Sequence, residues 1–533
     1  MTRLLRKKVC SSRAGPRSPR AEIEAALGEE EAELADGITI FLPGDQFLSV
    51  ALEAGHRHPG GMIRLAPILA LAAGILLAAF PCLSGQAAPA TNLIPNAGLR
   101  SGPDGRPADW STWTPRSILA PAMSVVNVGG KPALSLRAKR FADFGQWVTV
   151  APGIRPGAYY RVQALSWSKN VVSKEFSVMA LVTWTANEDG TKVLQSDYVD
   201  QRRLEEGGWV LNSRTIQAPV GARAACLRLG LHGTAGGSVL WRDIALTEVP
   251  PPPARIVRIV TTSIKPKYPS TVAVNMGLMA RMLDVVGPLR PDIVLFSENL
   301  VDRFVRGSME SKVEPIPGPL TRMLAQKARR YHTYIITTLH ERDRQDLYHN
   351  TAVLIDRSGR IAGLYRKVHL TLAEIDEGLT PGSTYPVFQT DFGKIGILTC
   401  YDNWFPADAR ILRLEGAEMI FWPLAGDGVP AHWRAVSVAR AVDNGVYLIS
   451  SATLTNNQSR ITNPAGEVVA TTAGDFSFAL KDIDLNQRWR KRYMSVPSGT
   501  GESRSLLIKE RRPDTYHVLV EGDPGVEPAE AVR

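Results

Sequence analysis

Between residues 91 and 249, apolar and polar side chains alternate in short runs. Gly, Pro, Asn or Asp separates one run from the next, and the runs include "GQWVTV", "YYRVQALSW", "FSVMALVTW", "AACLRLGLHG" and "SVLWRDIALTEV". A period of two turns one face of a strand toward a core and the other toward solvent. This segment therefore predicts an all-β domain, built as an antiparallel β-sandwich.

The pattern changes after a proline-rich linker at residues 250–254, which is expected to be stiff. From 255 to 485, short apolar runs alternate with longer amphipathic runs. The short runs include "ARIVRIVTTSI", "PDIVLFSE", "TYIITTLHE", "KIGILTC" and "EMIFWP", and the long runs include "TVAVNMGLMARMLDVVG", "GPLTRMLAQKARRYH" and "HWRAVSVARAVDNG". Strands that alternate with helices predict a layered α/β domain.

Residues 62–90 have the pattern of an export signal. A basic residue, Arg64, precedes an apolar stretch, and small residues that suit a signal peptidase follow it. Because 61 residues come first, two interpretations stay open. Either translation starts at Met62 and residues 1–61 are an unstructured or mistranslated extension, or residues 65–83 form a membrane anchor. Both predict a globular part outside the cytoplasm, periplasmic or secreted.

Composition and motif content exclude several classes of function. The net charge is +10, but the basic residues are scattered or lie in short runs, several of them in a C-terminal extension at 486–533. No phosphate loop, zinc-spaced cluster or nucleic-acid motif is present, so we expect no cofactor, no metal and no nucleic-acid partner. Removal of the signal would leave Cys226 and Cys400, which lie in separate regions and do not form a disulfide framework.

Cys400 follows an apolar strand and faces the start of a helix, where the helix dipole would favour a thiolate. The alternative is an inert buried cysteine. A nucleophilic cysteine needs a base for its proton and a cation or amide donors for the oxyanion. Glu298 in "VLFSENL" and Lys367 in "GLYRKVHL" offer those two roles, if the fold brings them together.

Residues 255–480 resemble the nitrilase, or carbon–nitrogen hydrolase, superfamily. The order of Glu298, Lys367 in "YRKVHL" and Cys400 in "CYDNWFP" carries the resemblance, supported by "HNTAVLIDRSGRI", "GLTPGSTYPVF", "GAEMI" and "ARAVDNGVYLISSA". It implies a four-layer αββα sandwich, commonly dimerised through a helix layer. It also implies that Cys400 attacks the substrate, Glu298 is the general base, Lys367 stabilises the oxyanion, and water hydrolyses a thioester without a cofactor.

Three positions depart from the pattern of that superfamily. Ser297 stands where Pro is frequent, Ala407 where an acid is usual, and Asp443 where Glu is common. Because Ala407 has no carboxylate, we expect Arg410 to pair with a different group.

Many members add a second carboxylate after the lysine, and Glu374 and Glu377 are both candidates here. We favour Glu374, because its interval from Lys367 is close to that of members with a "KxHL" start.

Substrate chemistry follows from the residues after the cysteine. Tyr401 and Asp402 resemble the amidase and carbamoylase branches, whereas nitrile-cleaving branches tend to place Trp there. We therefore expect a small-molecule amide or ureido substrate, with Tyr401 and Trp404 in contact with it. Nitrile hydrolysis by the same residues is the alternative.

The β-rich segment resembles galactose-binding-like jelly rolls, the fold of many carbohydrate-binding modules. Seven tryptophans lie in it and could stack on sugars, so a glycan is a candidate partner. Trp147 and Trp167 stand inside alternating strands and are expected to fill the core instead. A rival to the enzyme hypothesis is an exported glycan-binding protein whose hydrolase-like domain is inactive.

Overall fold

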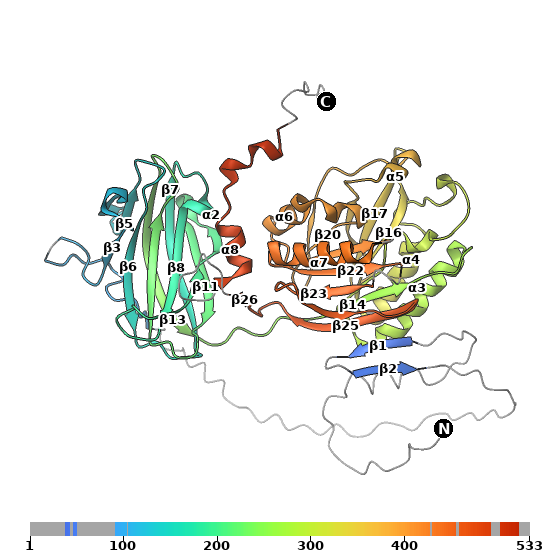
Figure 1. The fold of residues 1–533 in the computed structure, drawn as a ribbon, viewed down its shortest axis with the longest axis horizontal. Helices are drawn as coiled ribbons and strands as arrows, with labels where there is room; N and C mark the ends of the chain where they lie inside the picture. The colour runs from blue at the N-terminus through green and yellow to red at the C-terminus, as the bar shows by residue number, and fades with distance from the viewer. Residues whose placement is uncertain are drawn as a thin grey trace, which may run out of the picture. The chain divides into compact units, whose positions relative to one another are not determined.

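The computed structural model describes residues 38–42, 46–50, 91–103, 105–426, 429–454, 458–491 and 501–521 (Figure 1). The chain divides into two compact units. One unit combines Met1–Leu52 with Ala254–Trp489, and the other combines Glu53–Pro253 with Arg490–Arg533. The predicted export signal at 62–90 lies outside the described residues.

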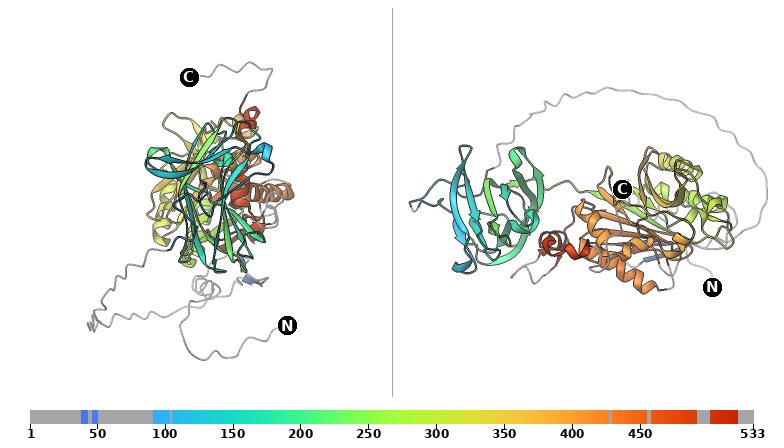
Figure 2. Two further views of the ribbon diagram at one scale, coloured as in Figure 1. Left: turned by 90° about the vertical axis from the view of Figure 1, so that its left-hand side faces the viewer. Right: turned by 90° about the horizontal axis from the view of Figure 1, so that it is seen from above.

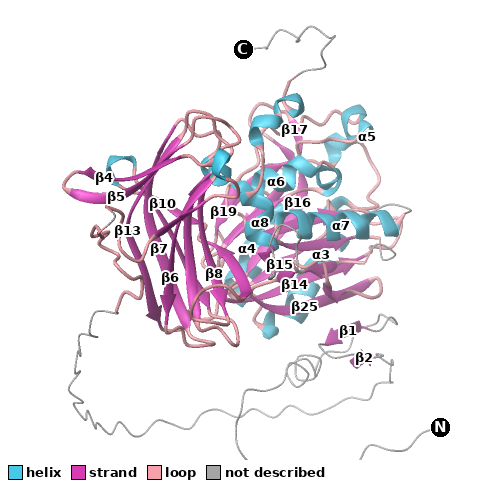
Figure 3. Ribbon diagram, turned by 60° about the vertical axis from the view of Figure 1, so that its left-hand side comes forward, coloured by secondary structure: helices cyan, strands magenta, loops and turns pink. Residues whose placement is uncertain are grey.

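The unit that contains residues 91–253 is built from two antiparallel sheets, whose strands are drawn in magenta in Figure 3. The six-stranded sheet has the order β10 (Gln201–Leu204), β11 (Val210–Gln217), β7 (Tyr159–Lys169), β13 (Ser238–Val249), β5 (Lys131–Arg137) and β4 (Ala122–Val128). The five-stranded sheet has the order β3 (Ser111–Trp113), β6 (Gly145–Pro152), β12 (Ala224–Leu231), β8 (Val178–Thr185) and β9 (Val193–Tyr198). The antiparallel strands predicted from the alternating pattern are therefore present.

One hydrophobic core joins these two sheets. Val162 on β7 and Trp241 on β13 meet Trp184 on β8 and Trp147 on β6 in the same buried cluster. Trp147 thus fills the core as expected. The same expectation for Trp167 is wrong: this side chain is half-buried and does not belong to the core cluster, because the inward positions of β7 are the ones in step with Val162.

The unit that contains residues 254–489 also has two sheets. The first has the order β18 (Ile361–Arg366), β17 (Tyr348–Ile355), β16 (Tyr334–Arg342), β15 (Ile293–Leu295), β14 (Ile256–Ile264) and β25 (Phe476–Asp484). Two strands from the predicted N-terminal extension, β1 (Ile38–Leu42) and β2 (Gln46–Val50), continue this sheet beyond β25. The second has the order β19 (Val387–Gln389), β20 (Lys394–Ile397), β21 (Met419–Leu424), β22 (Tyr447–Ala452), β23 (Arg460–Thr462) and β24 (Val468–Thr471).

Along the inner strands β15, β16 and β17, both faces of the first sheet are buried, which explains the continuous apolar runs of these strands. Ile293 and Leu295 on β15 point to a core shared with the second sheet, whereas Val294 points to a core with α3 (Val272–Val286) and α4 (Pro319–Tyr331). On its other face the second sheet packs against α6 (Pro406–Leu414) and α7 (Pro430–Asn444). The order of layers is therefore helix, sheet, sheet, helix. The right-hand view of Figure 2 shows this unit from above. The predicted αββα sandwich is present.

Among the described residues, one helical stretch, Val272–Leu289, is long and apolar enough to cross a membrane. Its residues Met279, Leu283 and Val286 are fully buried against the first sheet. The apolar character of this stretch is therefore explained by its place in the core.

The C-terminal extension returns to the β-sandwich unit. Its described parts include β26 (Arg490–Lys491), β27 (Gly501–Glu502) and α8 (Ser503–Lys509), and they belong to the same unit as residues 91–253. Arg214 on β11 pairs with Glu502 and donates a hydrogen bond of 2.8 Å to the Ser505 hydroxyl. Sequence alone did not show that this segment packs against the sandwich.

Candidate active site

Four polar side chains meet where strands of the two facing sheets end. Glu298 follows β15, Lys367 follows β18, and Cys400 follows β20 as the first residue of the 3₁₀ helix η6 (Cys400–Trp404). Glu374 lies on α5 (Leu372–Asp376), the short helix after Lys367. Glu298 and Lys367 are 69 positions apart in the sequence, and the fold brings them into contact.

Lys367 is the centre of the ionic contacts. Its ammonium lies 3.1 Å from Oε1 of Glu298 and 2.9 and 2.8 Å from the two carboxylate oxygens of Glu374. The side chain is 1% exposed. A buried ammonium of this kind is stable only because both carboxylates compensate for its loss of hydration.

Asn350 on β17 is a site residue that the sequence interpretation did not single out. Its side-chain amide donates to Oε1 of Glu298 at 2.9 Å and to Oε1 of Glu374 at 2.8 Å. It therefore holds the two carboxylates in fixed positions on either side of Lys367. The signal in the sequence was a polar amide inside the buried strand "YHNTAVLI".

Glu374 is fixed by its own helix. It is the third residue of α5 and forms a capping box with Thr371, whose backbone amide donates to Oε2 of Glu374 at 2.8 Å. Glu377, the other candidate, is exposed and caps the C-terminal end of α5. The structure thus brings Glu374, and not Glu377, into contact with Lys367.

The charges in the site shift one another's proton affinities. Burial by itself would raise the pKa of Glu298, but the Lys367 ammonium and hydrogen bonds from Cys400, Lys367 and Asn350 hold it below its usual value. Burial would lower the pKa of Lys367, and the carboxylate charges of Glu298 and Glu374 raise it instead. At neutral pH, Glu298 is therefore an anion and Lys367 a cation.

The thiol of Cys400 is protonated at rest. Burial, followed by the charge of Glu298, raises its pKa well above the usual value, and the thiol is hydrogen-bonded to Glu298. The expectation that a helix N-terminus would favour a thiolate here is wrong, because desolvation and the adjacent carboxylate outweigh the dipole. The thiol proton therefore faces the Glu298 carboxylate.

Cys400 has an unusual backbone conformation, with φ of +46°. Such a conformation costs a non-glycine residue about 1–3 kcal/mol and persists only when its surroundings fix it. The indole of Trp422 donates a hydrogen bond of 2.9 Å to the Cys400 carbonyl, and Ala425 donates its backbone amide to Oε2 of Glu298 at 3.0 Å. Contacts from β21 and from the residue just after it thus hold both the cysteine and its acceptor.

The two predicted substrate contacts flank the cysteine. Tyr401 is 39% exposed and packs edge-on against Phe405. Trp404 is half-buried, and its ring meets the rings of His432 and Trp433 near the start of α7. Both side chains lie on η6 with Cys400.

Two of the three departures from the superfamily pattern, Ser297 and Ala407, have local explanations. The Ser297 hydroxyl accepts a hydrogen bond of 2.8 Å from Thr453. Arg410, which lacks an acid at Ala407, donates at 2.5 Å to the carbonyl of Asp443. Arg410 is thus hydrogen-bonded to a backbone carbonyl, and not to an acid at position 407.

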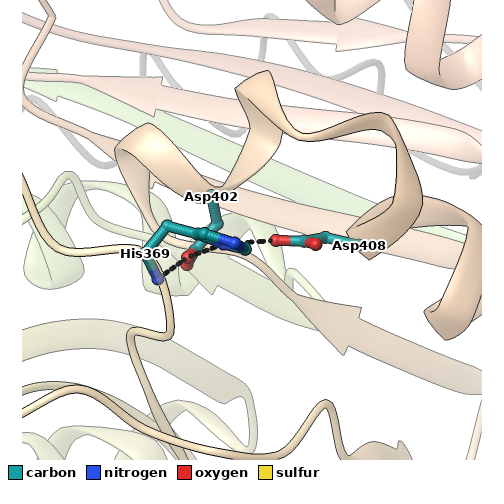
Figure 4. Close-up of side chains that lie close together, drawn as sticks. All are labelled: His369, Asp402 and Asp408. Atoms are coloured by element: carbon teal, nitrogen blue, oxygen red, sulfur yellow. Dashed lines mark hydrogen bonds and ion pairs between the residues drawn. The ribbon is translucent and has the colours of Figure 1, made fainter. Parts of the chain in front are cut away.

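In the part of the chain that the structure describes, one group of side chains could hold a metal ion: His369, Asp402 and Asp408 (Figure 4). Asp402 already accepts hydrogen bonds from the Tyr365 hydroxyl and the amides of Thr399 and His369. A metal would have to displace these donors. We therefore interpret the group as a hydrogen-bond network.

Comparison with known proteins identifies the class. The carbon–nitrogen hydrolase family model matches residues 257–492. The chain is 32% identical to N-carbamoylputrescine amidase of Solanum lycopersicum, over 47% of this chain and 90% of that protein. It is 30% identical to omega-amidase of Homo sapiens, over 38% of this chain and 77% of that protein.

A solved carbon–nitrogen hydrolase from Helicobacter pylori G27 is also similar, with 20% identity, coverage of 50% of this chain and 99% of that chain, and a TM-score of 0.42. On the family and sequence matches, the chain belongs to the carbon–nitrogen hydrolase family. It is a hydrolase that acts on carbon–nitrogen bonds other than peptide bonds.

Proposed function

We propose that the protein hydrolyses an amide or N-carbamoyl C–N bond through a thioester on Cys400. The observation that carries the proposal is the buried contact of a protonated thiol with the anionic Glu298, which itself touches the Lys367 ammonium at 3.1 Å. The three side chains supply a nucleophile, a base and a cation within one site.

In the first step, Sγ of Cys400 attacks the carbonyl carbon while Glu298 takes the thiol proton. The C=O electron pair moves to oxygen, and this oxyanion is stabilised by Lys367. Before attack, the ammonium and the carboxylates of Glu298 and Glu374 sum to −1. After attack, Glu298 is neutral and the oxyanion carries its charge, so the sum remains −1. The buried site therefore creates no additional net charge in the transition state.

In the second step, the tetrahedral intermediate collapses and the C–N bond breaks. Glu298 returns its proton to the nitrogen, which leaves as ammonia or an amine. Water then attacks the thioester with Glu298 again as base, the C–S bond breaks, and the proton regenerates the thiol. For an N-carbamoyl substrate, the released carbamic acid decomposes to an amine and CO₂.

Glu374 and Asn350 keep Lys367 and Glu298 in place during these steps. Glu374 makes two contacts with the ammonium, at 2.9 and 2.8 Å, and thus restricts it to one direction. Because the ammonium is already in position before the reaction, no free energy is spent on reorienting it when the oxyanion forms.

The amide and ureido classes are favoured by two kinds of support. Tyr401 and Asp402 follow the nucleophile, as in the amidase and carbamoylase branches. Several of the sequence relatives are named as amidases that act on an omega-amide or on N-carbamoylputrescine. Tyr401 and Trp404 are the side chains that we expect to contact the substrate beside the reacting carbon.

Product analysis tests this proposal and separates the classes. The purified protein is offered linear amides, N-carbamoyl amines and nitriles, and ammonia, CO₂ and acid are measured. Ammonia with acid indicates an amide, ammonia with CO₂ indicates a carbamoyl group, and turnover of nitriles alone would contradict the proposal. Acid quenching followed by mass spectrometry should find the acyl group on the peptide that contains Cys400, and an acyl group elsewhere would refute the mechanism.

We also propose that the reaction takes place outside the cytoplasm. The support is the export-like pattern of residues 62–90, with its basic start, apolar stretch and small residues. N-terminal sequencing of the protein recovered from the cell envelope or medium tests this. A chain found only in the cytoplasm would contradict it.

A further inference from the structure

Three segments of the hydrolase unit meet at one imidazole ring. His369 lies two residues after Lys367, Asp402 lies two residues after Cys400, and Asp408 is on α6. Nδ1 of His369 lies 2.9 Å from a carboxylate oxygen of Asp408 and 3.4 Å from one of Asp402 (Figure 4). The ring also stacks on Phe405, with 3.7 Å between centroids and 11° between planes.

Asp402 connects this ring to the strained cysteine. Its carboxylate accepts the backbone amide of Thr399 at 2.9 Å and that of His369 at 2.7 Å, and it accepts the Tyr365 hydroxyl at 2.6 Å. Thr399 is the residue directly before Cys400. The turn that holds the nucleophile is thus tied to the loop that follows Lys367 through a fully buried carboxylate.

From this geometry we propose that His369, held between Asp402 and Asp408, is a positioning residue that fixes the Lys367 loop against the Cys400 turn. The proposal rests on the proposed function for its kinetic effect. It goes beyond that function because none of the three residues touches the reacting atoms. Asp408 stands one residue after Ala407, the position at which the superfamily usually has its acid.

The network is sensitive to mild acid. Burial, helped by the nearby Asp402 carboxylate, raises the pKa of Asp408 to about 6, although His369 and Tyr385 act in the opposite direction. The hydrogen bond to Asp402 and the charge of Asp408 raise the pKa of His369, against burial. As the pH falls through 6, Asp408 is protonated while His369 stays charged, and the ion pair between them is lost.

Other charged and titratable groups around the ring are accounted for. Tyr385 donates to Asp408, and Tyr365 donates to Asp402. Arg440 on α7 donates to the carbonyls of Asn403 and Trp404 on η6, at 3.2 and 3.4 Å. Glu298 has a pKa below its usual value, so its protonation falls at a lower pH than that of Asp408.

The experiment measures two pH profiles between pH 5 and 9 on the full chain: kcat and KM for the best amide, and the alkylation rate of Cys400 by iodoacetamide. In the wild type, kcat should fall about tenfold from pH 7.5 to 5, with a midpoint near 6 and an unchanged KM. Alkylation of the protonated thiol slows with falling pH in every variant, so it is read as the wild-type rate divided by the Asp408→Asn rate, and this ratio should fall from about ten to one through the same midpoint. In Asp408→Asn, kcat should show no step between pH 7.5 and 5 and should stay near the low-pH level of the wild type. Asp376→Asn, on the exposed side of α5, is the matched control and should keep the wild-type profile.

His369 is tested with two variants. Asn retains a donor at the position of Nδ1 but not the charge, so His369→Asn should lose about tenfold in kcat at pH 7.5, as Asp408→Asn does, whereas His369→Ala should lose about thirtyfold. A midpoint near 6 that persists in Asp408→Asn, or a full kcat in His369→Ala, would overturn the positioning role. If no amide is hydrolysed but alkylation follows the expected profiles, the proposed function fails and the positioning role stands.

Discussion

Each of the two units of this chain buries a group of charged side chains. The two groups differ in whether they include a reactive side chain. In the β-sandwich unit, Arg214 pairs with Glu502, lies 3.3 Å from Asp200 and donates to the Ser505 hydroxyl. In the hydrolase unit, Lys367 is surrounded by two carboxylates in a similar way. Both cations are almost completely buried, and in both cases the opposing charges raise the pKa.

A reactive group distinguishes the two. The hydrolase network includes a protonated thiol whose neighbour Glu298 can accept its proton, on a residue with φ of +46°. The sandwich network ends on the C-terminal segment, where Ser505 donates to Asp200 at 2.5 Å and Tyr198 donates to Glu510 at 3.1 Å. A buried ion network is therefore not by itself a catalytic site; a transferable proton and a strained nucleophile are also needed.

Replacing the nucleophile should give the largest effect. Cys400→Ala removes the atom that forms the thioester, so we expect kcat/KM to fall at least 10⁴-fold, about 5.5 kcal/mol of transition-state stabilisation, with an unchanged melting temperature. Hydrolysis of the best substrate and thermal denaturation check this. Cys226→Ala, the matched thiol in the sandwich core, should keep full activity per folded molecule.

Substitution of the two glutamates in the α5 region should lower kcat by very different factors. Glu374→Gln removes one charge that positions Lys367, and a loss of about 10²- to 10⁴-fold in kcat is expected with the fold intact. Glu377→Gln alters an exposed side chain and should cost less than about tenfold. Steady-state kinetics on both variants test which glutamate is the second carboxylate of the site. A larger loss of kcat in Glu377→Gln would assign that role to Glu377.

The sandwich network should affect stability and not chemistry. Arg214→Met leaves Glu502 and Asp200 without their buried cation, so the free energy of unfolding of this unit should fall by about 3–5 kcal/mol. Arg203→Met, in an exposed pair with Glu205, should cost less than about 1 kcal/mol. Chemical denaturation measures both, and kcat of the folded Arg214 variant should not change.

The last prediction concerns the pH dependence of stability at Lys509 on α8, where burial and the charge of Arg202 lower the pKa to about 7. The unfolded chain binds this proton more tightly, up to the ordinary lysine value near 10.5. Stability of the sandwich unit should therefore rise as pH increases from 7 toward 10, by no more than about 1.4 kcal/mol per pH unit. Lys509→Met should flatten this dependence in denaturant titrations; an unchanged slope would assign it to other groups.

Several features of the fold were predictable because they rest on local periodicity. Alternating residues in "YYRVQALSW" predict a strand with one buried face, and apolar runs such as that of β15 predict strands buried on both faces. The exception was Trp167, where alternation indicated a strand and did not say which of its faces the core would cover. Packing between sheets decides that choice, and sequence spacing does not encode it.

The sequence by itself determined which side chains could carry the chemistry: Glu298, Lys367 and Cys400 stand in a recognisable order, each after an apolar strand. The tertiary structure alone decided that Glu374 reaches Lys367, that Asn350 joins the two carboxylates, and that the thiol is protonated at rest. The return of the C-terminal segment to the sandwich was also decided there. The reason is physical: pKa values and ion pairs depend on desolvation and on neighbours far away in the chain, and these exist only once the layers have packed.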